Sequence, residues 1–132
     1  MKMALEAVIT VLCGVGLYVS LFMLNKSRRA ERGELDEPSV VQTPAARLYG
    51  GMPNSEWGTA FYLALGVAIW FVRFPAVAIA IGAAVLFAAL TSIVLAYSLL
   101  FVTKRSCPFC WTGHAINWSL VVLCAALFKL SY

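Results

Sequence analysis

The chain has 132 residues, a typical length for one domain. Hydrophobic residues make up 62% of it and charged residues 12%, against about 25% charged residues in an average soluble protein, so the composition excludes a soluble globule. The net charge of +4 does not indicate a nucleic-acid-binding protein, because the basic residues flank apolar segments. Membrane lipid, through its phospholipid headgroups, is the partner that this arrangement favours.

Four apolar segments follow one another, with lengths near the roughly 20 residues that a helix needs to cross a bilayer. We expect helices over about residues 3–24, 55–72, 75–102 and 108–130, with a polar loop over residues 25–54. The predicted fold class is therefore an all-α integral membrane protein, a single domain formed by a four-transmembrane-helix bundle. An even number of spans places both termini on one face, and the loop and the start of the last helix on the other.

The first segment is predicted to be a retained helix and not a cleaved signal peptide. It is long enough to span, it lacks a small-x-small cleavage site before Asn25, and a strongly basic run follows it. We expect that run, Lys26–Arg29, to end the helix at a membrane surface. In the polar loop, Thr43 and Pro44 suit the start of a short interfacial helix over about residues 43–49.

The second and third predicted helices begin at residues that suit a helix start. Asn54 and Ser55 are good capping residues, and Pro75 fits a first helical turn. The third helix carries a small residue at every fourth position: Ala76, Ala80, Ala84, Ala88, Ser92 and Ala96. Small residues let helix backbones approach closely in a membrane. We expect this stripe to pack inside the bundle, with a homodimer seam as the alternative.

The four cysteines fall into two kinds. Cys13 and Cys124 lie well inside apolar helices, and we interpret both as small core residues. Cys107 and Cys110 are separated by two residues at the predicted start of the last helix. That spacing permits a reversible disulfide, and a helix N-terminus stabilises a thiolate. The pattern favours a redox-active dithiol, with Cys107 and Cys110 as the catalytic residues.

Other interpretations of the cysteine pair are weaker. A structural disulfide that closes so short a loop adds little stability. A metal held by Cys107, Cys110 and His114 lacks a fourth ligand from the chain, so no metal site is predicted. Covalent haem attachment requires a histidine where Trp111 stands. His114 lies one helical turn beyond Cys110, where it can influence the thiolate or hydrogen-bond a quinone oxygen; the alternative is a purely structural interfacial histidine.

Three stretches of the chain carry a resemblance to a known family: LCGVGLYVSL at 12–21 with the basic run at 26–32, NSEWG at 54–58 leading into FY at 61–62, and CPFCWTGHAIN at 107–117. In this order they resemble the vitamin K epoxide reductase family of membrane thiol oxidoreductases. The resemblance covers most of the chain, and the third stretch is its most specific part.

The resemblance implies a four-helix bundle that holds a quinone, of the menaquinone, ubiquinone or vitamin K type, beside the CxxC motif. It implies that Cys110 passes electrons to the quinone and that Cys107 exchanges with a thiol partner such as a thioredoxin-like protein. Asn54 matches a family asparagine that hydrogen-bonds a quinone oxygen, and His114 stands where animal members carry a tyrosine with that role. With Trp111, these two form the expected cofactor-binding set.

The loop departs from the family pattern. Family members usually carry two loop cysteines that shuttle electrons to the CxxC, and this chain has no cysteine between Cys13 and Cys107. Two interpretations follow. In the first, an external dithiol reaches Cys107 directly and the protein is a membrane thiol–quinone oxidoreductase. In the second, it is a catalytically degenerate structural or quinone-binding subunit of a larger membrane complex.

The distribution of basic residues and the family resemblance predict opposite orientations in the membrane. The loop face carries more bases (Lys26, Arg28, Arg29, Arg32, Arg47, Lys104 and Arg105) than the terminal face (Lys2, Arg73 and Lys129). The positive-inside rule then places the CxxC motif on the cytosolic side. The resemblance implies the oxidising side, periplasmic or luminal, and this is the side that we expect.

Overall fold

The computed structural model describes residues 1–34, 52–103 and 107–132, and these are almost entirely helical. The helices are α1 (Lys2–Glu31), α2 (Asn54–Ala68), α3 (Pro75–Tyr97) and α4 (Pro108–Ser131). A 3₁₀ turn, η3 (Ile69–Phe71), extends α2, and a π-helical segment, η4 (Ser98–Thr103), extends α3. Three helical stretches are long and apolar enough to cross a membrane: Lys2–Glu31, Pro75–Val102 and Pro108–Ser131. The predicted fold class, an all-α integral membrane four-helix bundle, is confirmed.

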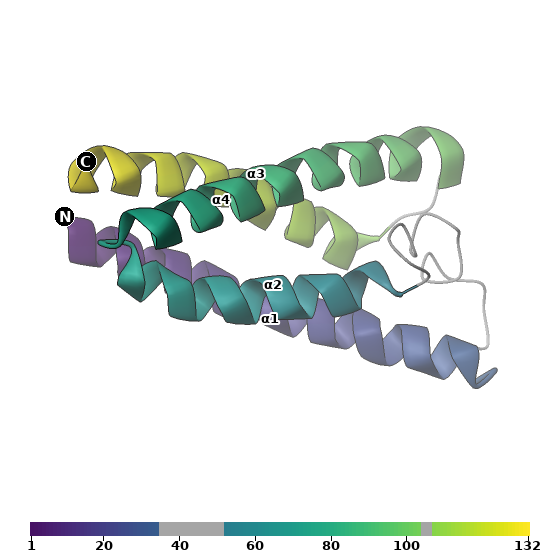
Figure 1. Ribbon diagram of the computed structural model, residues 1–132. Helices are drawn as coiled ribbons and strands as arrows, with labels where there is room; N and C mark the ends of the chain where they lie inside the picture. The colour runs from purple at the N-terminus through teal and green to yellow at the C-terminus, as the bar shows by residue number, and fades with distance from the viewer. Residues whose placement is uncertain (35–51, 104–106) are drawn as a thin grey trace.

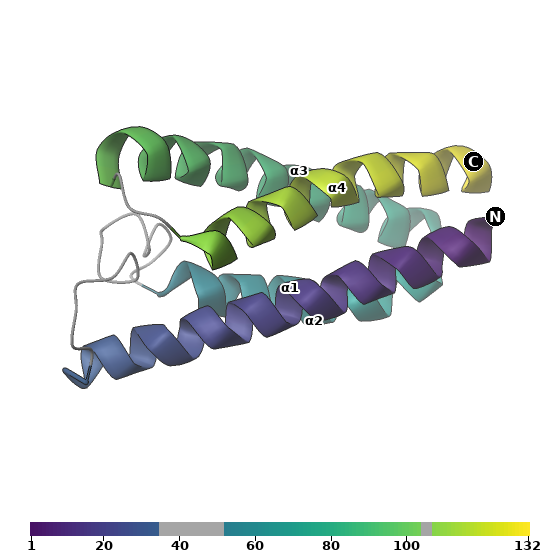
Figure 2. The same cartoon turned by 180° about the vertical axis from the view of Figure 1, so that it is seen from behind.

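The helices form two antiparallel pairs, α1 with α2 and α3 with α4 (Figure 1). The view from behind shows α4 lying over α1, so that α1 joins the two pairs (Figure 2). Contacts between α2 and α3 are few by comparison. Both chain termini lie at one end of the bundle, and α4 begins at the other end (Figure 1). The bundle is therefore least tightly closed along the side shared by α2 and α3.

The apolar core lies toward the end of the bundle that carries the termini. It contains buried side chains from every helix, among them Ile9 of α1, Leu65 of α2, Ile81 of α3 and Leu120 of α4. Lipid tails are as apolar as these side chains, so close packing, more than transfer out of water, stabilises this region.

The first helix continues past the point where the sequence predicted its end. We expected an end near Leu24, followed by loop, but α1 runs to Glu31 through the whole basic run. Lysine and arginine favour helix, so leaving the membrane does not by itself end one. Instead, the helix ends in a Schellman motif, in which the Glu34 N–H donates to Arg29 O and the N–H of Gly33, at φ +70°, donates to Ala30 O. The polar loop therefore starts later than predicted.

The other helix starts are close to the predicted ones. Pro75 and Pro108 occupy the first turns of α3 and α4, where a missing N–H costs nothing. Asn54 is the first residue of α2 and not its cap: Pro53 occupies the cap position, and no side chain caps the helix. The short helix predicted over residues 43–49 lies outside the described residues.

The stripe of small residues on α3 is only partly internal. Ser92 and Ala96 are buried and Ala88 is half-buried, but Ala76, Ala80 and Ala84 are exposed. The reason is geometric, because a residue at every fourth position advances about 40° around a helix of 3.6 residues per turn. The residues of α3 that do face the bundle are separated by three or four positions: Ala78, Ile81, Val85, Ala89, Ser92 and Ala96. The expectation that the whole stripe packs internally was wrong for its first half.

Candidate active site at the cysteine end of the bundle

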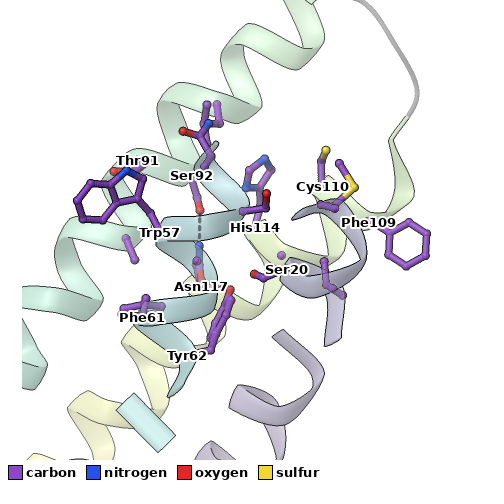
Figure 3. Close-up of a pocket in the computed structure, with 18 of the residues that line it drawn as sticks. Ser20, Trp57, Phe61, Tyr62, Thr91, Ser92, Phe109, Cys110, His114 and Asn117 are labelled. Carbon is purple, nitrogen blue, oxygen red and sulfur yellow. Dashed lines mark hydrogen bonds between the residues drawn. The ribbon is translucent and has the colours of Figure 1, made fainter. Parts of the chain in front are cut away.

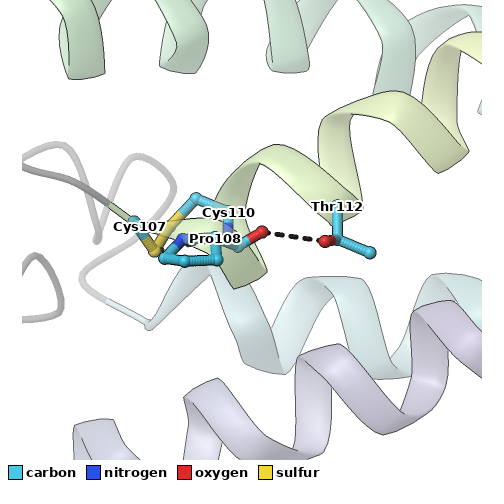
Figure 4. Close-up of a disulfide and its surroundings, with 4 residues drawn as sticks. All are labelled: Cys107, Pro108, Cys110 and Thr112. Atoms are coloured by element: carbon cyan, nitrogen blue, oxygen red, sulfur yellow. Dashed lines mark hydrogen bonds between the residues drawn. A yellow bond between two sulfur atoms is a disulfide. The ribbon is translucent and has the colours of Figure 1, made fainter.

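Cys107 and Cys110 form a disulfide at the start of α4 (Figure 4). Cys107 is the N-cap of the helix, and its Sγ accepts a hydrogen bond of 3.2 Å from the backbone N–H of Cys110. Thr112 Oγ1 donates to the carbonyl of Pro108 at 2.8 Å, which ties the first turn together. Because a helix N-terminus presents unpaired N–H groups, the same geometry stabilises a thiolate on Cys107 once the disulfide is reduced.

The two cysteines differ in their surroundings. Cys110 is half-buried and lines a cavity between the helices, whereas Cys107 is only 6% exposed and is not part of the cavity wall. One sulfur-bearing side chain therefore faces a possible ligand inside the bundle, and the other lies behind it. In this conformation Cys107 is therefore the less accessible of the two cysteines to a thiol from outside the bundle.

The cavity has a volume of about 340 Å³ and is lined by all four helices (Figure 3). Its wall is mostly apolar, with Val19, Met23, Phe61 and Leu95 among the lining residues. A volume of this size and a few polar groups on an apolar wall are typical of sites for small organic ligands. The cavity can thus enclose a flat apolar ring beside Cys110.

The cavity wall includes exposed side chains on the side where α2 and α3 separate. Trp57 of α2 and Phe87 of α3 both line it, and both are also exposed on the outer surface, at 48% and 58%. Few contacts join these two helices, so side chains rather than packed backbones form this wall. This part of the cavity wall is therefore formed by side chains that also reach the surface of the bundle.

Three polar side chains from three helices form a hydrogen-bonded chain in the cavity wall. The Tyr62 hydroxyl of α2 donates to Asn117 Oδ1 of α4 at 2.5 Å, and Asn117 Nδ2 donates to Ser92 Oγ of α3 at 2.7 Å (Figure 3). Gly16 of α1 makes room for the Tyr62 ring, because a Cβ at that position would lie 2.6 Å from it. The chain fixes the relative positions of α2, α3 and α4 around the cavity.

The predicted ligand-binding residues are only partly brought together. Asn54, at the start of α2, and His114 line the same cavity as Cys110. His114 is 7% exposed and is held between two indole rings, with centroid distances of 5.8 Å to Trp111 and 6.0 Å to Trp118. Trp111 itself is not part of the cavity wall. The structure thus gives Trp111 contact with His114 and none with the cavity.

The sequence prediction missed the Tyr62–Asn117–Ser92 chain. Each residue lies in an otherwise apolar helix, and isolated polar residues in membrane helices often mark functional sites. That signal was present, but serines and tyrosines in such helices are too numerous for it to select these three.

The remaining cysteines and acids add no second site among the described residues. Cys13 and Cys124 are unpaired and buried in the apolar core, as the sequence predicted. No group of three or more His, Cys, Asp or Glu side chains comes together there in a way that could hold a metal ion. The cavity and the cysteine pair are accordingly the place to look for chemistry.

The model of the Vitamin K epoxide reductase family matches residues 7–125, a range that contains the cysteine pair, the cavity wall and the hydrogen-bonded chain. A search of curated proteins found no match.

Proposed function

Because this chain belongs to the vitamin K epoxide reductase family, we propose that it is a membrane thiol–quinone oxidoreductase. Family membership supports a membrane oxidoreductase, and the cavity supports the finer assignment. The observation that carries the proposal is the placement of Cys110 in the wall of a mostly apolar cavity that is also lined by Asn54 and His114. The substrate that fits is a quinone of the menaquinone, ubiquinone or vitamin K type.

The proposed reaction has two balanced steps. In the first, a donor dithiol reduces the Cys107–Cys110 disulfide by thiol–disulfide exchange through Cys107, and the donor leaves as a disulfide. In the second, the Cys107 and Cys110 thiols lose two electrons and two protons and close their disulfide again, while the quinone gains both electrons and both protons to become the hydroquinone. The Cys107 thiolate is favoured by the N-terminus of α4, which lowers the barrier to both steps.

In this proposal Asn54 and His114 hold the ring. Both residues line the cavity, and their side chains can hydrogen-bond a carbonyl oxygen. The two indoles beside His114 restrict its ring orientation, so the imidazole can present a nitrogen to the ligand without a search over rotamers. Trp111 would act on the ligand only through His114.

A thioredoxin-like dithiol protein is the proposed electron donor, since the chain itself has no cysteines between Cys13 and Cys107. We propose that the cysteine end of the bundle faces the oxidising, periplasmic or luminal side, where such partners exchange disulfides. The orientation can be measured by labelling single cysteines placed at Arg32 and at Tyr132 with a membrane-impermeant reagent in intact cells. Labelling at position 32 is expected; labelling only at 132 would reverse the assignment.

The function is tested by quinone reduction with purified protein, a small dithiol and a short-chain quinone. Wild-type protein should turn over, and Cys110→Ala should reduce no quinone above the uncatalysed rate. Cys124→Ala is the matched control, because this cysteine is buried in the core away from the cavity, and it should retain turnover. If the wild-type protein binds the quinone but never reduces it, the result would support the rival function, a degenerate quinone-binding or structural subunit. It would overturn the proposal that the protein is an enzyme.

A further inference from the structure

Ser92 lies on α3 in the wall of the cavity and is 1% exposed. Its oxygen accepts the hydrogen bond from Asn117 Nδ2, but a hydroxyl also has a hydrogen to donate. Elsewhere in the bundle, the hydroxyls of Thr10, Thr59 and Thr112 donate to the carbonyl four residues earlier. Within the described residues, the one side-chain hydrogen bond of Ser92 is the bond that it accepts from Asn117, and no bond that its hydroxyl donates is found there.

The direction of the hydrogen-bonded chain determines what Ser92 offers. The Tyr62 hydroxyl donates to the amide oxygen of Asn117, and this places the amide nitrogen toward Ser92. One lone pair of Ser92 Oγ is thereby occupied, while its hydrogen and its second lone pair remain. Buried donors in proteins nearly always have a partner, because an unpaired one costs about 1–3 kcal/mol. Because Ser92 lines the cavity, a ligand atom bound there can supply such a partner.

We propose that the Ser92 hydroxyl binds an oxygen of the quinone ring and is a specificity-determining residue of this site. The inference rests on the proposed function and extends it. Ser92 donates to the carbonyl oxygen of the oxidised ring. With its second lone pair it accepts from the hydroxyl of the reduced ring, so both redox forms are held. Asn117 and Tyr62, which also line the cavity, are assigned as positioning residues, because their hydrogen bonds orient the Ser92 hydroxyl.

The test is the affinity of the oxidised, disulfide-bonded protein for 2-methyl-1,4-naphthoquinone, measured by tryptophan-fluorescence quenching without any dithiol. Ser92→Ala should weaken binding about tenfold, the effect of one lost hydrogen bond. Ser92→Thr retains the hydroxyl and should stay within about threefold of wild type. Ser119→Ala, an exposed serine on α4 outside the cavity, is the matched control and should bind like wild type.

A double-mutant cycle separates contact from positioning. Tyr62→Phe removes the hydrogen bond that Asn117 Oδ1 accepts, so the Asn117 side chain is held less firmly. It should weaken quinone binding by less than Ser92→Ala does. In the Ser92→Ala background, Tyr62→Phe should add no further loss, because its effect passes through the missing hydroxyl. Equal additional losses in both backgrounds would contradict the positioning role.

Binding by Ser92→Ala within twofold of wild type, with an intact monodisperse bundle, would overturn the inference and leave the proposed function standing. An equal loss in Ser92→Ala and Ser92→Thr would also overturn it, since packing and not the hydroxyl would then be responsible. A wild type that shows no binding of the quinone would overturn the proposed function together with the inference. Quinone binding at the expected affinities without quinone reduction would overturn only the proposed enzymatic activity.

Discussion

At the end of the bundle that carries both termini, the four helices enclose Ile9, Ile69, Leu120 and Leu127 so fully that none of these side chains is exposed. At the cysteine end, the same helices surround a cavity of about 340 Å³. Among the residues that line the cavity are small ones from all four helices: Ser20, Gly58, Ala84, Ala88, Ser92 and Gly113. Branched aliphatic side chains fill the same space in the packed half.

This contrast suggests a division of roles along the bundle: the packed half stabilises the fold, and the half with the cavity binds the ligand. Tyr62 belongs to both halves: its ring is part of the apolar core, and its hydroxyl begins the polar chain in the cavity wall. Substitutions in the packed half should therefore change the free energy of unfolding, and substitutions in the hollow half should change ligand binding. Four predictions test this division.

The largest effect is expected in the packed half. Leu120→Ala should lower the free energy of unfolding by about 2 kcal/mol, the low end for a buried leucine, because packing contacts are lost while transfer to lipid is nearly neutral. Leu130→Ala, at a side chain that is 53% exposed, should change it by less than about 0.5 kcal/mol. Unfolding in mixed micelles measures both. Equal losses would mean that the terminal half is not the stabilising half.

The next effect is expected in the hollow half. Ala84→Leu adds side-chain volume at the cavity wall and should raise the KM for the quinone about tenfold, equivalent to about 1.4 kcal/mol, with little change in unfolding. Ala80→Leu is the matched control one turn earlier on α3, exposed and outside the cavity wall, and should leave KM unchanged. If both variants raise KM alike, the cavity is not where the quinone binds.

The junction between the halves should be sensitive to Gly16. A Cβ there would lie 2.6 Å from the Tyr62 ring, which is packed in the core and cannot yield freely. Gly16→Ala should therefore cost about 1 kcal/mol of unfolding free energy and also weaken quinone binding through the displaced hydroxyl. Gly14→Ala has open space around its Cβ and serves as the control. A fully tolerated Gly16→Ala would show that the Tyr62 position is not critical.

Much of the fold follows from local sequence features. Apolar segments of spanning length predict the helices, and Pro75 and Pro108 mark two of the starts because proline suits a first helical turn. The end of α1 was missed because the basic run indicates where the chain leaves the membrane, whereas the helix ends only where Gly33 adopts a left-handed conformation. A charge pattern marks the boundary of the lipid and not the boundary of a helix.

The candidate site was predicted in its chemistry and not in its full geometry. The spacing of Cys107 and Cys110 and the position of His114 one turn later are properties of a single helix, which periodicity can predict. The Tyr62–Asn117–Ser92 chain depends on which faces of three helices meet, and the sequence of one helix carries no information on its rotation against another. Trp111 was expected in the cofactor-binding set, and the structure places it beside His114 and outside the cavity wall.

The smallest effect should lie outside the bundle, where α1 ends in water. Arg32 donates to both carboxylate oxygens of Glu34, at 2.9 and 3.2 Å, and this hydrogen bonding lowers the pKa of Glu34. When the pKa of a glutamate is lower in the folded state than in the unfolded state, the folded state is stabilised at any pH above the ordinary pKa of glutamate. This contribution is lost as the pH falls through the lowered pKa. Arg32→Gln should raise the Glu34 pKa toward its ordinary value in an NMR titration, while Arg28→Gln should not. Since the pair is exposed to solvent, the loss of unfolding free energy should be too small to resolve, and quinone binding should stay unchanged, in keeping with a division of roles that is confined to the bundle.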